Sequence, residues 1–198
     1  MHPSAFGDRG QAFPIYITVV AGLLFLALAY LAVGQASVNR SGAQSAADAA
    51  ALAAAQNRRN QITGKWLESL TDPTKWQDIL DGKADFAPSC WRAEQLAAEN
   101  DAEVLACDNP EPLKFVVQVR TNKPLGDSVV PGVSDIKSTE SATAVIQQLC
   151  DFDPPAEAAD TSPLPSLTCD DGRVWKLDPK DEAGLPSPED LFDVHLAD

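Results

Sequence analysis

Histidine is scarce in this 198-residue sequence, and the familiar catalytic and ligand-binding motifs are missing from it. The two histidines, His2 and His195, stand at opposite ends of the chain, so metal sites and catalysis that depend on imidazole have almost no material. The sequence contains no Gly-rich phosphate loop, no H-E-x-x-H and no G-x-S-x-G. We therefore expect a protein that is not an enzyme and that needs no cofactor.

Positive charge is also in short supply. The chain has 15 Lys+Arg against 29 Asp+Glu, a formal net charge of −14. The acidic excess lies late in the chain, because residues 1–60 hold four arginines and two aspartates whereas 151–198 hold three basic and 13 acidic residues. A surface that binds phosphates needs clustered positive charge, so this balance argues against nucleic acid as a partner.

One long stretch near the N-terminus carries no charge at all. Residues 12–33, AFPIYITVVAGLLFLALAYLAV, would span about 33 Å as a helix, which matches a hydrocarbon core of about 30 Å. Tyr16 and Tyr30 lie near its two ends, where amphipathic rings favour the headgroup level. We expect a retained transmembrane helix over 12–34, preceded by a cytoplasmic leader, 1–11. The alternative is a secretory signal cleaved near Gly34–Ala36, although this apolar run is longer than a usual signal core.

Four cysteines follow the apolar stretch, and none has the C-x-x-C spacing of metal or redox sites. Of the three pairings that four cysteines allow, the one local in sequence joins Cys90 to Cys107 and Cys150 to Cys169. Disulfides persist outside the cytosol, so we expect a single-pass protein of the cell membrane with a cytoplasmic N-terminus and the bulk of the chain extracytoplasmic. Four unrelated buried thiols are the alternative.

The apolar run continues without a turn signal into an alanine-rich segment. Alanine is the strongest helix former, so we expect one helix from about residue 12 to residue 62, with 35–62 as an extension beyond the membrane. Arg40, Gln44 and Asp48 recur every four residues and form a polar stripe. Another face carries very small side chains, which permit close approach of a neighbouring helix. The alternative is a plain alanine spacer that projects the rest of the chain.

Several residues of this helix are candidates for packing against partner helices. On this interpretation Ala46→Leu or Ala53→Leu would weaken association without unfolding the rest of the chain. The candidates are Gly22, Gly34, Gly42, Ala46, Asp48, Ala49 and Ala53.

The N-terminal region resembles a known family. Arg9-Gly10 before an apolar helix, followed by the block QSAADAAALAAA at 44–55, is similar to TadE/TadG-like proteins, which are pseudopilin-like components of tight-adherence (Tad, or Flp) pilus systems. The resemblance covers 9–56 and, more loosely, 90–146. It implies a membrane-anchored component of pilus assembly whose partners are the membrane and other pilus-assembly or pilin-like proteins, in a homo- or hetero-oligomer.

The same resemblance points to a processing site. Prepilins are cut after a glycine, and the candidate bond here joins Gly10 to Gln11. The fifth residue of the mature chain is usually glutamate in such proteins, whereas Ile15 stands here and Tyr16 keeps the aromatic sixth place. A carboxylate in lipid needs a partner, and Ile15 needs none. The sequence leaves open whether a prepilin peptidase acts at Gly10.

Residues 63–150 are expected to form an α+β domain. Short helices are predicted from Pro73 to Leu80 and from Trp91 to Asn100, capped by Ser89. Period-two alternation predicts strands at 102–107, 114–120 and 140–146. A long pilin-like N-terminal helix followed by a small disulfide-bonded unit of helices and antiparallel sheet is therefore the expected fold. We expect the tryptophans of this part, Trp66, Trp76 and Trp91, to lie in the core.

The tail falls into two parts. Residues 151–166 are acidic and rich in proline, which indicates a solvated linker. Residues 167–198 contain the turn signal Asp171-Gly172 and an alternating stretch at 192–196, so we expect a hairpin and a strand that fold back onto the sheet. A Ca²⁺ site is a weaker interpretation of the linker's carboxylates, which are Asp151, Asp153, Glu157 and Asp160.

The features together favour a structural component of a Tad/Flp-type pilus assembly or secretion machine. It would act by helix–helix packing and by extracytoplasmic protein contacts. The alternative is an anchored or secreted acidic binding module with no pilus role.

Overall fold

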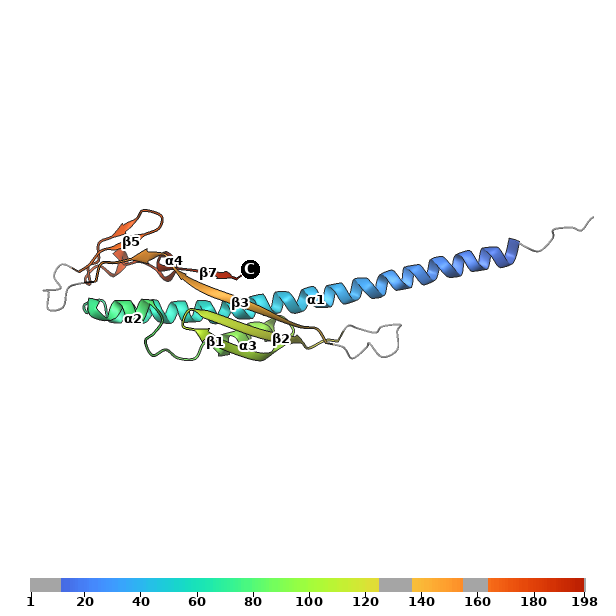
Figure 1. Cartoon of the computed structure of the whole chain (residues 1–198), viewed down its shortest axis with the longest axis horizontal. Coiled ribbons are helices and arrows are strands. Elements are labelled where there is room, and N and C mark those ends of the chain that lie inside the picture. Colours follow the sequence, from blue (N-terminus) through green and yellow to red (C-terminus); the bar gives the residue numbers. More distant parts are fainter. Residues whose placement is uncertain (1–11, 125–136, 155–163, 198) are drawn as a thin grey trace, which may run out of the picture.

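A single helix dominates the structure, a computed structural model that describes residues 12–124, 137–154 and 164–197. Helix α1 runs without a break from Ala12 to Glu68, 57 residues, which corresponds to about 86 Å (Figure 1). No proline occurs between Pro14, in the first turn, and Pro73, beyond the last. The helix outlasts the predicted end near residue 62 because Ile62 and Trp66, four residues apart, both face the core and are fully buried.

Three short α-helices follow α1 in the described part of the chain. The 3₁₀ turn Pro73–Lys75 leads into α2, Trp76–Leu80, so the predicted helix from Pro73 is present in two pieces. Helix α3, Cys90–Glu99, begins after Ser89, whose side chain makes no capping hydrogen bond. The buried Ser89 hydroxyl instead accepts a hydrogen bond from Gln61 Nε2 of α1, at 3.2 Å. After the 3₁₀ turn Glu182–Gly184, helix α4 covers Pro188–Leu191.

Four antiparallel strands form the main sheet, in the order β1-β2-β3-β7. The alternation predicted for the second strand is confirmed, because Phe115, Val117 and Val119 are all buried. The strands are β1, Ala102–Glu111; β2, Lys114–Thr121; β3, Thr139–Gln148; and β7, Phe192–Leu196. The last strand pairs with β3, as expected of a C-terminal segment that folds back onto the sheet.

A smaller sheet, β4-β5-β6, lies at the end of the molecule away from the N-terminus (Figure 1). Its strands are β4, Cys150–Asp151; β5, Leu167–Cys169; and β6, Val174–Trp175. The turn between β5 and β6 contains Gly172 at φ +84°, a left-handed conformation that suits glycine, so the hairpin predicted from Asp171-Gly172 is confirmed.

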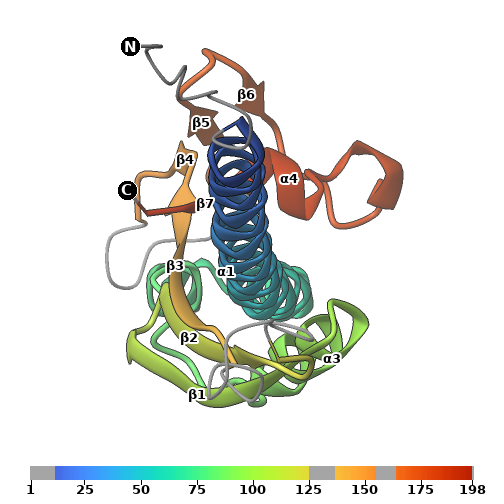
Figure 2. The same ribbon diagram turned by 90° about the vertical axis from the view of Figure 1, so that its right-hand side faces the viewer.

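The sheet and the helices wrap around the C-terminal half of α1. Viewed along the helix, β3, β2 and β1 curve around one side while α3 and α4 lie on others (Figure 2). Near the C-terminal end of α1 the core includes an aromatic cluster. The Trp66 and Trp76 rings meet edge to face at 5.3 Å, and Trp76 meets Phe152 at 5.2 Å. The prediction that Trp91 is also buried is wrong: it lies in the first turn of α3 and is 53% exposed.

Two disulfides close the domain, with the pairing that is local in sequence. Cys90 of α3 is bonded to Cys107 of β1, and Cys150 of β4 is bonded to Cys169 of β5. The first bond ties a helix to the sheet, and the second joins two directly paired strands. Each closes a short loop, so each stabilises the folded domain mainly by restricting the unfolded chain.

Candidate membrane-anchoring and assembly surface

The N-terminal half of α1 is apolar and uncovered. Residues Phe13–Leu31 form a stretch of mean hydropathy 2.2, none of it buried within the chain, and it is long and apolar enough to cross a membrane. At 1.5 Å per residue it measures about 28 Å, close to a bilayer's hydrocarbon core. Thr18, a polar residue of this stretch, donates its hydroxyl to the Ile15 carbonyl at 2.8 Å, so that group is satisfied inside the helix.

Polar contacts mark the place where α1 enters the domain. Arg40 reaches across to Glu140 of β3, with Nε and Oε1 2.9 Å apart. One turn later, Gln44 Nε2 donates to Asp48 Oδ1 at 2.7 Å. The expected polar stripe therefore exists, and its first member fixes the helix to the sheet. The first alanine of α1 that is fully buried among the described side chains is Ala43, just after this ion pair.

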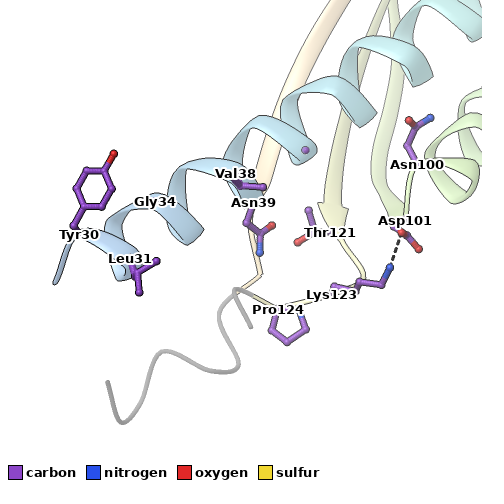
Figure 3. Close-up of a pocket in the computed structure, with 11 residues that line it drawn as sticks. Tyr30, Leu31, Gly34, Val38, Asn39, Asn100, Asp101, Thr121, Lys123 and Pro124 are labelled. Carbon is purple, nitrogen blue, oxygen red and sulfur yellow. Dashed lines mark hydrogen bonds and ion pairs between the residues drawn. The ribbon is translucent and has the colours of Figure 1, made fainter. Parts of the chain in front are cut away.

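A groove of about 660 Å³ lies at the same junction, between the helix and the tip of the main sheet. Figure 3 shows its two walls facing each other. At the polar wall the Lys123 ammonium lies 2.7 Å from the Asp101 carboxylate. The helix wall consists of Tyr30, Leu31, Gly34, Val38, Asn39 and Gly42, and the opposite wall of Asn100, Asp101, Thr121, Lys123 and Pro124.

The three glycines expected to pack against partners lie on open surface. At Gly22, Gly34 and Gly42 a Cβ atom would meet no other atom within 4 Å. These positions are therefore accessible along the uncovered part of α1. Glycine lets two helix backbones approach closely, so the geometry keeps this use available at all three.

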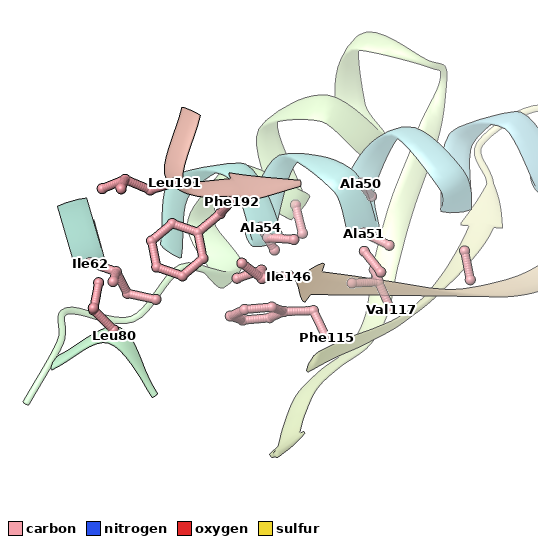
Figure 4. Close-up of a cluster of buried hydrophobic side chains, with 14 of the residues drawn as sticks. Ala50, Ala51, Ala54, Ile62, Leu80, Phe115, Val117, Ile146, Leu191 and Phe192 are labelled. Atoms are coloured by element: carbon pink, nitrogen blue, oxygen red, sulfur yellow. The ribbon is translucent and has the colours of Figure 1, made fainter. Parts of the chain in front are cut away.

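The expected partner contacts of Ala46 and Ala53 need correction. Ala46 is fully buried and Ala53 is 6% exposed, inside the chain's own domain. Figure 4 shows neighbouring alanines of the same helix packed against side chains of β2, β3 and β7. Ala49 and Asp48 are half-buried. The small side chains let the chain's own sheet and helices close on α1, which leaves no room for a partner helix at these positions.

Some sequence-based candidates fall outside the described residues. Gly10 and Gln11, the expected processing site, are among them, and so are Glu157 and Asp160 of the suggested Ca²⁺ site. Within the described residues, no three His, Cys, Asp or Glu side chains gather where they could hold a metal ion. His195 lies on β7 beside Asp193, 2.8 Å away, in an exposed position.

The sequence did not reveal the polar wall of the groove. Asn100 and Asp101 follow α3, whereas Thr121, Lys123 and Pro124 end β2, and the pairing of β1 with β2 brings the two groups together. Ala102 is paired with Thr121 in the register of these strands. Only that long-range register places the wall beside α1, so no local pattern could have signalled it.

A buried cation lies deeper in the domain. Arg58 is 9% exposed, and its guanidinium carbon lies 5.0 Å from the Phe86 ring centre and 5.6 Å from that of Phe115. Burial lowers the pKa of Arg58 from its ordinary value. The rings face a cation at stacking distance, which accounts for an arginine tolerated in this core.

Comparison with known proteins gives one match. The family model Tad, described as "Putative Flp pilus-assembly TadE/G-like", matches residues 10–57. No curated protein and no solved structure matches the chain. The matched residues take in the whole uncovered half of α1 and the start of its buried half. Over residues 10–57 the chain is therefore similar to TadE/G-like proteins of Flp pilus assembly, the family that its sequence resembles.

Proposed function

We propose that this protein is a membrane-anchored structural component of a Tad/Flp-type pilus assembly or secretion machine. The observation that carries the proposal is the division of one unbroken helix. Its first half is apolar, uncovered and within the family match, and its second half is the core of a disulfide-bonded domain. The matched family is one of assembly proteins, which supports a structural role over an enzymatic one.

Anchoring and assembly use the same surface in this proposal. Residues 12–34 cross the membrane, with the N-terminus in the cytoplasm and the domain outside. The two disulfides support that orientation, because such bonds persist outside the cytosol. Gly22 lets a neighbouring pilin-like helix approach the backbone, since close packing rather than a hydrophobic driving force holds helices together in lipid. The partner is a second copy of this chain or another pilus-assembly protein.

The domain supplies the contacts outside the membrane. Its charge is strongly negative, and electrostatic attraction to a basic partner affects the rate of encounter more than the affinity. Trp91, exposed on α3 beside the Cys90–Cys107 bond, is the largest exposed aromatic side chain among the domain's described residues. Aromatic side chains are enriched at interfaces, which makes this face of α3 the part of the domain best suited to contact a neighbour.

A helix exchange tests the assembly role. Residues 13–31 are replaced by an unrelated apolar transmembrane helix of the same length, and piliation and membrane fractionation are measured in cells that lack the native chain. We expect the variant to stay in the membrane while piliation is lost. A matched control, Leu24→Ile, keeps both. Full piliation by the exchanged chain would mean that α1 is only a tether and would favour the anchored acidic binding module.

The mature N-terminus tests the anchoring. Intact-mass measurement of the protein from native membranes distinguishes three cases. Loss of residues 1–10 indicates cleavage between Gly10 and Gln11 by a prepilin-type peptidase, and an intact N-terminus indicates a plain anchor. Loss of residues 1–36 would mean that the apolar segment is a cleaved signal, which would overturn the proposal.

A further inference from the structure

The groove between α1 and the tip of the sheet has walls of two kinds. The helix wall begins with Tyr30 and Leu31, which are 81% and 60% exposed and lie at the end of the apolar stretch. The opposite wall is polar and carries the Lys123–Asp101 ion pair. A volume of about 660 Å³ is within the range of small-molecule sites. The groove is thus continuous at one edge with the surface that we assign to the membrane.

Its height along the helix places the groove at the membrane surface. If Gly34, the last residue of the proposed membrane span, marks the edge of the hydrocarbon core, Val38 lies about 6 Å beyond it. The headgroup layer of one leaflet is about 5–8 Å thick, so the groove begins in that layer and opens into water. The polar wall therefore stands at the level where lipid phosphates and amines lie.

The charges of the groove are balanced. Lys123 contributes one positive and Asp101 one negative group, and the other polar side chains, Asn39, Asn100 and Thr121, are neutral. An anionic headgroup would be attracted by the ammonium and repelled by the carboxylate at nearly the same distance. A headgroup with both a phosphate and an ammonium can satisfy the two together, because the lysine donates to the phosphate and the aspartate accepts from the amine.

We propose, on the basis of the membrane anchoring proposed above, that this groove seats the headgroup of a zwitterionic phospholipid. Gly34 and Gly42 face open space in the groove, since a Cβ at either residue would meet nothing within 4 Å. Leu31 contacts the first methylenes of the lipid, and Val38 and Pro124 lie beside its headgroup. The bound lipid fixes the height and rotation of the domain on the membrane.

Photocrosslinking of the full chain in vesicles tests the site. The vesicles contain phosphatidylethanolamine and phosphatidylglycerol in equal amounts, and p-benzoylphenylalanine is introduced separately at Pro124, Thr139, Leu24 or Val174. Pro124 lines the groove, whereas Thr139 starts β3 at the same end of the sheet but does not line it. Val174, in the small sheet at the far end of the molecule, is the negative control, and Leu24, inside the apolar stretch, is the positive one.

We expect lipid adducts at 24 and at 124, a much lower yield at 139, and none at 174. At 124 the adducts with phosphatidylethanolamine outnumber those with phosphatidylglycerol. Gly34→Leu, which fills the groove from the helix side, reduces the yield at 124 to that at 139 and leaves the yield at 24 unchanged. Lys123→Glu reduces the phosphatidylethanolamine adduct at 124 by about fivefold, the scale of one exposed charge pair. The control Lys180→Glu, an exposed lysine elsewhere, changes nothing.

Other results overturn the inference. Equal yields at 124 and 139 would mean that the sheet tip is merely near the bilayer. A protein adduct at 124 would mean that another chain occupies the groove, and adducts with phosphatidylglycerol alone would exclude a zwitterionic occupant. These three results leave the anchoring intact, because the probe at 24 still reports lipid. Absence of lipid at 24 would overturn the anchoring itself and the inference with it.

Discussion

The two halves of α1 belong to one helix but differ in the size and the exposure of their side chains. The first half exposes large residues such as Phe25, at 70%, and Tyr30, at 81%, whereas the second buries alanines completely. From residue 13 to residue 55 of this helix, size therefore runs against burial, whereas the large side chains of Ile62 and Trp66 are buried near its end. The reason is the neighbour that each half meets. In the proposed function the uncovered half has lipid or another helix as its surroundings and can present large apolar surface there. The alanine-rich part of the wrapped half is enclosed by strands and helices that come close over small side chains.

The largest expected effect comes from removing a large side chain from the wrapped half. Trp66→Ala removes a fully buried indole beside Trp76 and lowers the free energy of unfolding by about 3–5 kcal/mol. The matched change in the other half, Phe25→Ala, leaves the stability of the domain unchanged. Denaturant unfolding of the full chain in detergent, followed by tryptophan fluorescence, measures both. A comparable loss in the two variants would contradict the division of the helix.

The second prediction concerns the Cys90–Cys107 disulfide, which lies in the domain and not in the uncovered half of α1. Replacement of Cys90 and Cys107 by serine removes a cross-link with a sequence separation of 17 residues and destabilises the domain by about 3 kcal/mol. The uncovered half should keep its helicity, since no cross-link reaches it. Unfolding curves in detergent measure the stability of the domain, and circular dichroism in detergent measures the helicity that remains. If the domain of the double variant is as stable as the native one, the covalent tie between α3 and β1 is dispensable.

Small-to-large changes on α1 separate the halves more finely. Ala46→Leu overfills a closed core and costs about 1–3 kcal/mol, whereas Gly22→Leu meets open space and leaves the domain's stability unchanged. The association of the chain should respond in the opposite way, because Gly22 lies on the surface proposed for partner helices. Thermal unfolding measures the stability of the domain, and cross-linking in membranes measures the association of the chain. Intact stability with Ala46→Leu would restore the partner contacts first expected of Ala46.

Lowering the pH should destabilise only the domain that wraps the second half of α1, and this effect should be the smallest of those predicted here. Hydrogen bonds from the Ser187 hydroxyl and backbone, at 2.7 and 3.0 Å, together with Arg173, hold the pKa of Asp190 below its ordinary value of 3.8. A lowered pKa in the folded state contributes stability that is present above pH 3.8 and is lost as the pH falls below it. Residues 13–39 contain no Asp, Glu, Lys, Arg or His, so their helix should not respond.

Hydrogen exchange at β7 measured between pH 5 and pH 3 tests this expectation. Protection of the native strand should fall toward pH 3, and in Asp190→Asn it should depend less on pH, because the titrating carboxylate is gone. Asp178→Asn, which changes an exposed aspartate outside α4, is the control. An unchanged pH response in Asp190→Asn would assign the acid sensitivity to other carboxylates.

Much of the fold was readable from local patterns. The alternation at 114–120 predicts a strand because one face of the sheet is buried, and the run of alanines predicts a helix because propensity alone favours it. An alanine in the sequence does not indicate which element packs against it, since a small side chain permits close approach of either a helix or a sheet. Ala46 was therefore assigned to the wrong partner. Trp91 misled for a related reason, because size alone does not bury an aromatic side chain.

The candidate site divides in the same way. The anchoring stretch and Gly22 and Gly34 are contiguous in sequence, so composition and period were enough to find them. The groove needs Asp101 and Lys123 beside Leu31, and these residues meet only after β1 pairs with β2 and the sheet closes on α1. No sequence pattern carries that arrangement, because Leu31 is 70 positions from Asp101 and 92 from Lys123.

The absence of a break in α1 has a mechanical consequence. From Leu31 to Glu68 the rod measures about 56 Å, with no proline at which it could bend. Transmembrane helices tilt by about 20° on average, and a stiff lever of this length turns such a tilt into a displacement of about 19 Å at its far end. The small sheet β4-β5-β6 sits at that end. A modest reorientation inside the bilayer would thus swing the outer face of the domain through nearly the width of two helices.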